Sequence, residues 1–277
     1  MIIDFLSIGF ENLVLLGHYS YKEAREKLHI HRHTDMVEIC YLETGYQNYQ
    51  IGGKQFLLKG GDVLVTPPNV LHGTSGFPEE KGSLFWMILK VPKGPFKLLN
   101  LSETESRLIV ENIITLPSLH FRGSSKLKSA LAQIFTIYNS KSNVYQKIEI
   151  KNQVLIFLLE IIKCGEKLGV KQLVPDIDYV CNYIDKNISQ KFRIHELAKM
   201  VNLSESRFKH KFKSEAGIPP NEYILKKKIE FAKKQIHNQK LSLTDLAYDL
   251  GFSSPSYFST VFRKYVGVPP SEYKVSG

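Results

Sequence analysis

Short runs of β-prone residues, separated by turn residues, fill the N-terminal part of the chain. The runs are five to eight residues long and rich in Val, Ile, Leu, Tyr and Phe, as strands are. The pair Gly52-Gly53 predicts a tight hairpin, because glycine adopts positive φ without a steric clash. Many short strands at this spacing indicate a sandwich or barrel. The predicted strands are 13–20, 36–43, 46–51, 54–58, 62–66 and 84–91.

From about Ser102 the hydrophobic period becomes helical, with helices predicted at 102–116, 126–139 and 145–166. Ser102 and Glu105 have the spacing of a capping box. The third helix carries two apolar seams, so either it is buried within its own domain or one seam contacts a partner subunit. One seam contains Ile148, Leu155, Leu159 and Ile162, and the other contains Val154, Leu158 and Ile161. Residues 165–175 have the composition of a linker.

After Pro175 the sequence repeats itself at a spacing of fifty residues. Each copy predicts a helix, a tight turn and a second helix, with Asn202 in the first turn and Ser204 as the following N-cap. In the second copy Gly251 takes the turn and Pro255 lies in the first turn of the second helix. The matching positions are Phe208/Phe258, Phe212/Phe262, Gly217/Gly267, Pro219/Pro269, Pro220/Pro270, Glu222/Glu272 and Tyr223/Tyr273.

The two copies are joined by a predicted helix over residues 219–238. About 18 helical residues span about 27 Å, close to the roughly 34 Å between successive major-groove openings on one side of B-DNA. The second helix of each copy buries its Phe pair on one face and leaves the other face free. The spacing therefore favours two DNA-recognition helices in adjacent grooves.

Charge supports a polyanionic partner. The 277 residues carry a net charge of +10, and residues 175–277 contain 17 Lys plus Arg against 11 Asp plus Glu.

The three cysteines, Cys40, Cys164 and Cys181, form no CxxC pair, as expected of free thiols in a reducing cytosol. The N-terminal segment lacks the basic start of a signal peptide, and no apolar run is long enough to cross a membrane. We therefore expect a cytoplasmic protein that does not bind membranes.

Residues 175–274 resemble the double helix-turn-helix domain of AraC/XylS-type bacterial transcription regulators. The stretch DLAYDLGFSSPSYFSTVFRKYVGVPPSEYK is close to that family's signature. The resemblance implies that outward residues early on each second helix face base edges and that later basic residues contact phosphates. The second copy offers only short hydroxyls, so we expect more specificity from the first. The base-facing candidates are Ser206, Lys209, His210, Ser256, Ser259 and Thr260, and the phosphate candidates are Lys213, Arg263 and Lys264.

The stretch HIHRHTDMVEICYLETG raises a separate hypothesis. His31-x-His33-x4-Glu38-x6-Gly45 resembles the first cupin motif, and Gly61-x5-Pro67-x-Asn69-x2-His72 resembles the second, with Asn69 where glycine is usual. Strand alternation places His31 and His33 on one face. Three histidines and one carboxylate are the set that holds a divalent metal in cupin enzymes, so His31, His33, Glu38 and His72 are candidate metal ligands.

The resemblance to AraC-type regulators favours a different use of the same residues. Such regulators commonly carry a cupin-like barrel that binds an effector without chemistry, and no general base or nucleophile constellation indicates catalysis. We therefore expect no enzyme activity, no catalytic residues and no cofactor. A pocket for a small polar molecule needs hydrogen-bonding groups and an aromatic platform. The ligand-binding candidates are His31, His33, Glu38, Tyr41, His72 and Trp86.

Together these patterns predict an α+β multidomain protein: a cupin-like β-barrel with helices over residues 1–170, which binds an effector and dimerises, and an all-α DNA-binding domain over residues 175–277. The expected partners are double-stranded DNA, a small-molecule effector such as a carbohydrate and a second copy of the chain, with RNA polymerase as a further candidate. Three alternatives remain open: a metal-binding cupin sensor or enzyme with a tethered DNA-binding domain, a sequence-neutral DNA packager, and a regulator whose barrel binds nothing.

Overall fold

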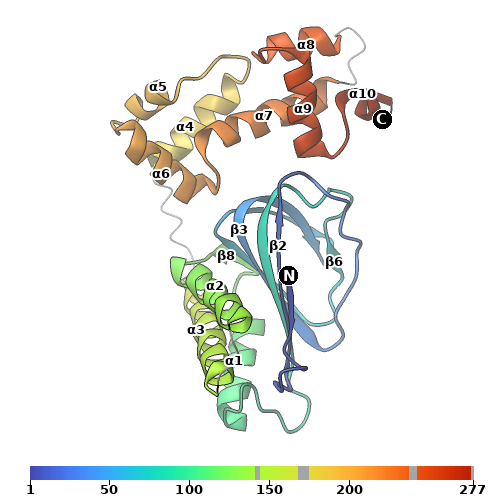
Figure 1. The fold of residues 1–277 in the computed structure, drawn as a ribbon, viewed down its shortest axis with the longest axis vertical. Coiled ribbons are helices and arrows are strands. Elements are labelled where there is room, and N and C mark those ends of the chain that lie inside the picture. Colours follow the sequence, from blue (N-terminus) through green and yellow to red (C-terminus); the bar gives the residue numbers. More distant parts are fainter. Residues whose placement is uncertain (141–143, 168–174, 237–241, 276–277) are drawn as a thin grey trace. The chain divides into compact units, whose positions relative to one another are not determined.

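The computed structural model describes residues 1–140, 144–167, 175–236 and 242–275. Its backbone divides into two compact units (Figure 1). The first, which is β-rich and ends in helices, contains residues 1–20, 28–76 and 83–170. The second, which is helical, contains residues 171–277 together with two short segments, 21–27 and 77–82.

The first unit is built on one curled antiparallel sheet whose central path runs β1-β2-β7-β3-β5-β8. Two further strands, β4 and β6, both pair with β3. The hairpin predicted at Gly52-Gly53 is present between β3 and β4, and both glycines have positive φ (+54° and +83°). The strands are β1 Ile2–Asp4, β2 Leu13–Tyr21, β3 Met36–Ile51, β4 Lys54–Lys59, β5 Asp62–Thr66, β6 His72–Gly73, β7 Gly82–Lys90 and β8 His120–Arg122.

The prediction of two separate strands at 36–43 and 46–51 was wrong, because β3 runs without a break through sixteen residues. Its first part pairs with β5, from Glu38 opposite Thr66 to Tyr41 opposite Val63. Its second part pairs with β4 and β6. Gly45 in the middle has a φ of +99°, so the strand bends there without ending. One strand thereby serves both halves of the sheet.

Three helices cover one face of this sheet: α1 Glu103–Ile114, α2 Ser125–Asn139 and α3 Gln146–Glu166 (Figure 1). The predicted capping box is confirmed, since Ser102 accepts a hydrogen bond from the Glu105 amide and the Glu105 side chain accepts one from the Ser102 amide. Of the predicted linker, Gly165 and Glu166 belong to α3, whereas residues 168–174 lie outside the described residues.

Alternation along β3 divides the apolar residues of the first unit into two cores. Val37, Ile39 and Tyr41 pack with the helices in the larger core. Cys40 and Leu42 point to the opposite side, where they pack with Leu64 and Leu84 in a smaller interior core. The candidate residue Glu38 has the same parity as Cys40 and therefore points to the interior side.

The second unit contains the two predicted helix-turn-helix units. Asn202 takes the first turn with a φ of +53°, and Gly251 takes the second with a φ of +68°. Ser204 caps α6 through the Arg207 amide, as predicted, and Ser254 caps α9 in the same way through the Tyr257 amide. The helices are α4 Pro175–Lys186, α5 Ile194–Lys199, α6 Glu205–Ala216, α7 Pro220–Gln235, α8 Leu243–Asp249, α9 Pro255–Val266 and α10 Pro270–Val275.

The connecting helix α7 is shorter than predicted. It contains 16 residues and ends at Gln235, so its length is about 24 Å at 1.5 Å per residue. The last two residues of the predicted range, 237 and 238, lie outside the described residues. Ile229 and Ala232 of α7 enter the core of the second helix-turn-helix unit, together with Ile236, which caps the helix. This packing fixes α7 against α8 and α9.

Candidate functional sites

The structure brings together the four candidate metal ligands. One ligand atom from each of His31, His33, Glu38 and His72 lies within 4.8 Å of the other three. Two of the four come from the segment before β3, one from β3 itself and one from β6. His31 and His72 exchange both backbone hydrogen bonds, with N···O distances of 2.9 and 2.8 Å. This bridge holds the two distant parts of the chain side by side.

The departure from the second cupin motif is accommodated by the backbone. Asn69 stands where that motif usually has glycine, and its φ is +64°. Asparagine is among the few residues that adopt this left-handed conformation at low cost. Its side chain also accepts a hydrogen bond from the Asp35 amide at 3.2 Å. The turn that presents His72 is therefore intact.

Glu38 is the centre of the cluster and is almost fully buried. Its Oε2 accepts a hydrogen bond from His33 Nε2 at 2.9 Å, and its Oε1 accepts one from Cys40 Sγ at 3.1 Å. Burial alone would raise the pKa of Glu38, but these hydrogen bonds and the nearby His72 hold it well below its ordinary value. The pKa of His72 is raised, because the Glu38 carboxylate outweighs the effect of burial.

The outward nitrogens of two rings are anchored to the backbone. His31 Nδ1 donates to the His29 carbonyl and His72 Nδ1 donates to the Val70 carbonyl, each at 2.9 Å. In the neutral rings this leaves Nε2 without a proton. His72 Nε2 is buried, and in the described part of the chain it is the one buried side-chain nitrogen or oxygen without a hydrogen bond. Its distance of 3.7 Å to Glu38 Oε2 is too long for one.

The two aromatic ligand-binding candidates, Tyr41 and Trp86, lie on opposite sides of the sheet. The prediction that Tyr41 contacts a ligand beside Glu38 was wrong, because Tyr41 lies on the other face of β3 in the core against the helices. Burial there raises its pKa to about 12. Trp86 points to the interior side and packs with Tyr19 at a ring-centroid distance of 6.1 Å. Its indole covers Gly17, where a Cβ would come within 2.1 Å of the ring.

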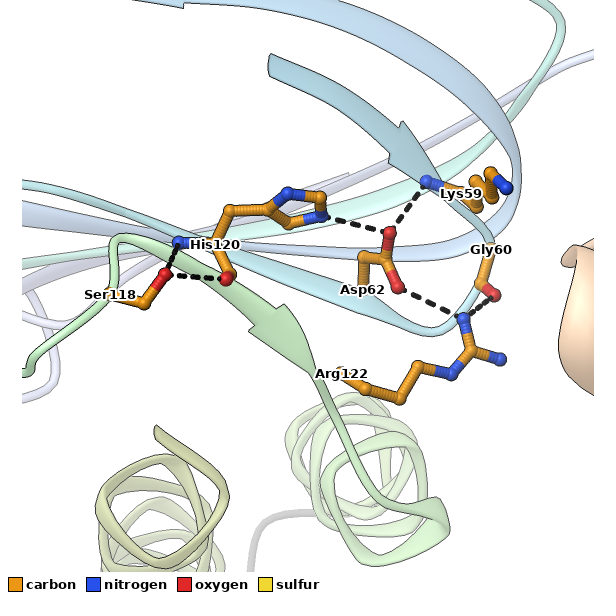
Figure 2. Close-up of polar contacts among 6 residues, drawn as sticks. All are labelled: Lys59, Gly60, Asp62, Ser118, His120 and Arg122. Atoms are coloured by element: carbon orange, nitrogen blue, oxygen red, sulfur yellow. Dashed lines mark hydrogen bonds and ion pairs between the residues drawn. The ribbon is translucent and has the colours of Figure 1, made fainter. Parts of the chain in front are cut away.

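Sequence reasoning missed a second polar cluster, on β5 and β8 (Figure 2). Asp62 Oδ2 accepts hydrogen bonds from His120 Nε2 and the Lys59 amide, both at 2.9 Å, and Oδ1 accepts one from Arg122 at 3.0 Å. Burial would raise the pKa of Asp62, but these donors hold it below its ordinary value. The β8 strand has only three residues, so no alternation was visible in the sequence.

The second unit presents the predicted DNA-contacting residues on two equivalent helices. On α6, Phe208 and Phe212 are fully buried, whereas Ser206, Lys209, His210 and Lys213 are exposed. On α9, Phe258 and Phe262 are buried, whereas Ser256, Thr260, Arg263 and Lys264 are exposed and Ser259 is half-buried. Each helix ends at a glycine with positive φ, Gly217 or Gly267, which turns the chain into the next helix.

Two of these side chains already have intramolecular partners. Lys209 forms an ion pair with Glu205 one turn earlier on α6, so its ammonium must leave that carboxylate to contact a base. Thr260 donates its hydroxyl hydrogen to the Ser256 carbonyl at 3.0 Å. A hydroxyl engaged in this way offers a base edge only its acceptor lone pairs. Each of the two helices therefore holds one of its candidate residues in an intramolecular contact.

Comparisons with known proteins agree with this architecture. A family model described as an AraC-like ligand binding domain matches residues 18–146, and one described as a helix-turn-helix domain matches residues 197–275. LumQ of Photobacterium leiognathi, a probable transcriptional regulator, is 38% identical over 93 residues, which are 34% of this chain and 38% of LumQ.

Two longer matches cover both units. YdiP of Escherichia coli, an uncharacterised HTH-type transcriptional regulator, is 23% identical over 264 residues, which are 88% of this chain and 80% of YdiP. The MmsAB operon regulatory protein of Pseudomonas aeruginosa is 23% identical over 263 residues, which are 94% of this chain and 81% of that protein.

A β-rich domain with a buried polar cluster, followed by two helix-turn-helix units, defines a DNA-binding transcription regulator with its own ligand-binding domain. More specifically, the chain belongs to the AraC type of ligand-responsive transcription regulators. In the ranges that the structure describes, none of the helices combines the length and apolarity needed to cross a membrane.

Proposed function

We propose that this regulator changes transcription when a small polar effector, such as a sugar, binds to the interior side of its N-terminal sheet. The observation that carries the proposal is the cluster of His31, His33, Glu38 and His72, in which Glu38 and His72 are buried and the other two are half-buried. Burying the Glu38 carboxylate and the His72 imidazole costs stability unless their polar atoms find partners. Such convergent polar groups beside apolar and aromatic walls are typical of ligand sites. Trp86 supplies the aromatic wall, since it lies on the same side of the sheet.

We propose that α6 and α9 bind adjacent major grooves of a defined operator. Ser206, Lys209 and His210 contact bases in one groove, and Lys213 contacts a phosphate. Ser256, Ser259 and Thr260 lie at the base edges of the next groove, with Arg263 and Lys264 on phosphates. An arginine or lysine that contacts guanine discriminates by about 1–3 kcal/mol, which short hydroxyls do not match. Most sequence specificity therefore comes from α6.

We further propose that two copies associate through α3. Val154, Leu158 and Ile161 are fully buried within the first unit, so that seam is not available to a partner. The other seam is open: Ile148 is 55% exposed, Ile156 46% and Leu159 40%. Leu155 and Ile162 extend it as partly buried residues. An apolar stripe on a 21-residue helix, interrupted between Ile148 and Leu155 by Lys151 and Asn152, suits an isologous pairing with the same helix of a second copy.

The remaining features of the proposal follow from this mode of action. Residues 1–170 form the effector-binding and dimerisation domain and residues 175–277 the DNA-binding domain. The protein acts in the cytoplasm, where its operator lies, and performs no catalysis. Effector binding shifts the population of dimer arrangements, so that one operator geometry is favoured and the contact with RNA polymerase changes.

The DNA contacts are tested by alanine substitution on α6. Lys209→Ala should relax specificity at one base position by about 1–3 kcal/mol, and Lys213→Ala should reduce the salt slope of binding by about one with specificity unchanged. Lys211→Ala is the matched control, because Lys211 lies on the same helix but pairs with Asp176 of α4 at 3.0 Å. Footprinting and salt titrations on one promoter measure these effects. Equal behaviour of all three variants would contradict the assignment.

Lysines introduced into the exposed seam of α3 test the proposed dimer. Leu155→Lys combined with Leu159→Lys should yield monomers in sedimentation velocity, because two ammonium groups would meet their symmetry mates in an apolar seam. Ala132→Lys combined with Gln133→Lys adds the same charge to the exposed side of α2 and should leave dimers intact. Dimers that persist in the first variant would end the assignment of α3.

The effector is sought by thermal unfolding of the full chain in the presence of sugars and other polar metabolites. A ligand at about 100 times its Kd adds roughly 2.7 kcal/mol of stability to the state that binds it. Trp86 is the single tryptophan, so its fluorescence reports unfolding of the first unit. A hit should lose its effect in Glu38→Gln. A hit that stabilises Glu38→Gln equally would place its site elsewhere.

A further inference from the structure

We propose that His31, His33, Glu38 and His72 bind a divalent transition-metal ion of the Zn²⁺, Co²⁺ or Ni²⁺ class. The inference deepens the effector site proposed above, because the ion would be the part of that site that the effector contacts. It does not depend on DNA binding. The observations that carry it are the convergence of four donor atoms, the burial of two of them and the unpartnered nitrogen of His72.

The unpartnered nitrogen is the sharpest of these observations. A buried nitrogen without a hydrogen bond costs about 1–3 kcal/mol, and each one in a native protein calls for an explanation. His72 is 1% exposed, and its Nε2 lies 3.7 Å from Glu38 Oε2. An ion bound by both atoms would supply the missing partner of the nitrogen and neutralise the carboxylate. A bound metal ion would thus offset both the cost of the unpaired His72 nitrogen and the cost of the buried Glu38 carboxylate.

The donor atoms need only a small contraction to coordinate an ion. Zinc lies about 2.0–2.2 Å from nitrogen and oxygen ligands, so tetrahedral ligands are roughly 3.4 Å from each other. The four donors already lie within 4.8 Å of one another. The ring centroids of His31, His33 and His72 are 4.3 to 5.2 Å apart. The longest of these separations must therefore shorten by about 1.4 Å, which side-chain rotations shared among the four residues can supply.

Backbone hydrogen bonds also hold the imidazole rings of His31 and His72 in place. His31 and His72 each donate Nδ1–H to a backbone carbonyl, of His29 and Val70 respectively. This arrangement fixes the ring and aims the Nε2 lone pair inward, as metal-binding histidines require. His33 donates Nε2–H to Glu38, so on binding an ion its proton moves to Nδ1, with no net loss of charge. Cys40 supports Glu38 through the second carboxylate oxygen.

The donor set selects the class of ion. Three imidazoles and one carboxylate suit Zn²⁺, Ni²⁺, Co²⁺ and Fe²⁺, whereas Mg²⁺ and Ca²⁺ prefer oxygen ligands throughout. Four protein ligands leave a position open on an ion that takes five or six. A hydroxyl or carboxylate of the effector fits such a position. This explains how a small polar molecule would be recognised by a cluster that is largely buried.

The test compares two histidines with matched surroundings. His33 and His120 have side chains that are 24% and 26% exposed, and each has Nε2 at 2.9 Å from a buried carboxylate. Only His33 belongs to the cluster of four. Full-length protein stripped with a chelator is titrated with Zn²⁺ and Co²⁺ by calorimetry, and the Co²⁺ complex is followed by visible absorption.

One ion per chain is expected, with d–d bands of nitrogen and oxygen ligation. His33→Gln and His72→Gln should weaken binding at least tenfold, and His120→Gln should leave it unchanged. Absence of stoichiometric binding, or equal losses in His33→Gln and His120→Gln, would overturn the proposal. An intense charge-transfer band would overturn this ligand set too, because it would place a cysteine thiolate on the ion.

Folding of each variant is checked in metal-free protein by Trp86 fluorescence. If His72→Gln does not fold, His31→Gln replaces it, since His31 is less buried. Operator binding by the metal-free protein is measured in parallel. Retained DNA binding without any ion binding would refute the metal site and leave the regulator intact, whereas lost DNA binding with normal ion binding would refute the proposed operator contacts.

Discussion

Replacing Asp62 with asparagine should destabilise the N-terminal unit at neutral pH and do so less in acid. Asp62 is 8% exposed and accepts hydrogen bonds from His120, Arg122 and the Lys59 amide. Asparagine has similar volume, but it keeps one acceptor oxygen, and its NH₂ group faces a donor. Hydrogen bonds to charged groups contribute about 1.5–3 kcal/mol each. Because His120 and Arg122 are partly exposed, we expect values near the lower end of this range. We expect a loss of roughly 2–3 kcal/mol at pH 7.

The pH dependence follows from the direction of the pKa shift. The pKa of Asp62 is lower in the folded protein than its ordinary value of 3.8, so its stabilising effect is complete above that value. The effect is lost as pH falls below 3.8, by at most about 1.4 kcal/mol for each pH unit. The difference between the wild-type protein and Asp62→Asn should therefore shrink by about 1 kcal/mol between pH 7 and pH 3.

Urea unfolding followed by Trp86 fluorescence measures the effect, because this single tryptophan lies on β7 of the first unit. With an m-value of about 2 kcal/mol/M, a loss of 2 kcal/mol lowers the midpoint by about 1 M. Asp35→Asn is the control, since among the described residues the Asp35 carboxylate pairs with the exposed groups of Lys93 and Asn69, and its midpoint should change little. Wild-type stability of Asp62→Asn at pH 7, or a loss at pH 3 as large as that at pH 7, would contradict the role assigned to the Asp62 carboxylate.

Two further predictions concern packing and capping. Gly17→Ala should cost about 1–3 kcal/mol and shift the Trp86 emission, because the new Cβ would come within 2.1 Å of the indole ring; an unchanged spectrum and midpoint would contradict the packing. Ser204→Ala and Ser254→Ala should each cost about 1 kcal/mol in thermal unfolding followed by far-UV circular dichroism, since each removes a cap hydrogen bond. A loss in only one of the two would show that the copies are capped differently.

The helical half of the protein was the more predictable from sequence. Its signals are local: Ser204 caps the helix that follows it, and the aromatic pairs four residues apart define the buried face of α6 and α9. The repeat made the prediction of the buried face more certain, because Phe208 and Phe258 occupy matching positions and were both expected to be buried. The ion pair of Lys209 with Glu205 and the hydrogen bond from Thr260 to the Ser256 carbonyl were not predicted from the sequence.

The β-rich half was predicted less completely, for physical reasons. The partners of a strand are distant in sequence: Asp62 receives its hydrogen bonds from His120 and Arg122, which lie on a strand too short to show a pattern. Two strands were predicted where β3 is one, because residues 36–43 and 46–51 are separate β-prone runs, whereas the strand bends at Gly45 and continues. The error at Tyr41 was avoidable. It lies three positions from Glu38, and residues separated by an odd number in a strand point to opposite faces.

The paired burial of Phe208 with Phe212 and of Phe258 with Phe262 has a consequence for how such a protein can change. The two scaffolds are equivalent inside and differ outside, so the solvent-facing residues of one can be grafted onto the other without disturbing the fold. If α6 and α9 contact bases as proposed, a chimera that carries Ser206, Lys209 and His210 of α6 at the matching positions of α9 should bind two copies of one half-site.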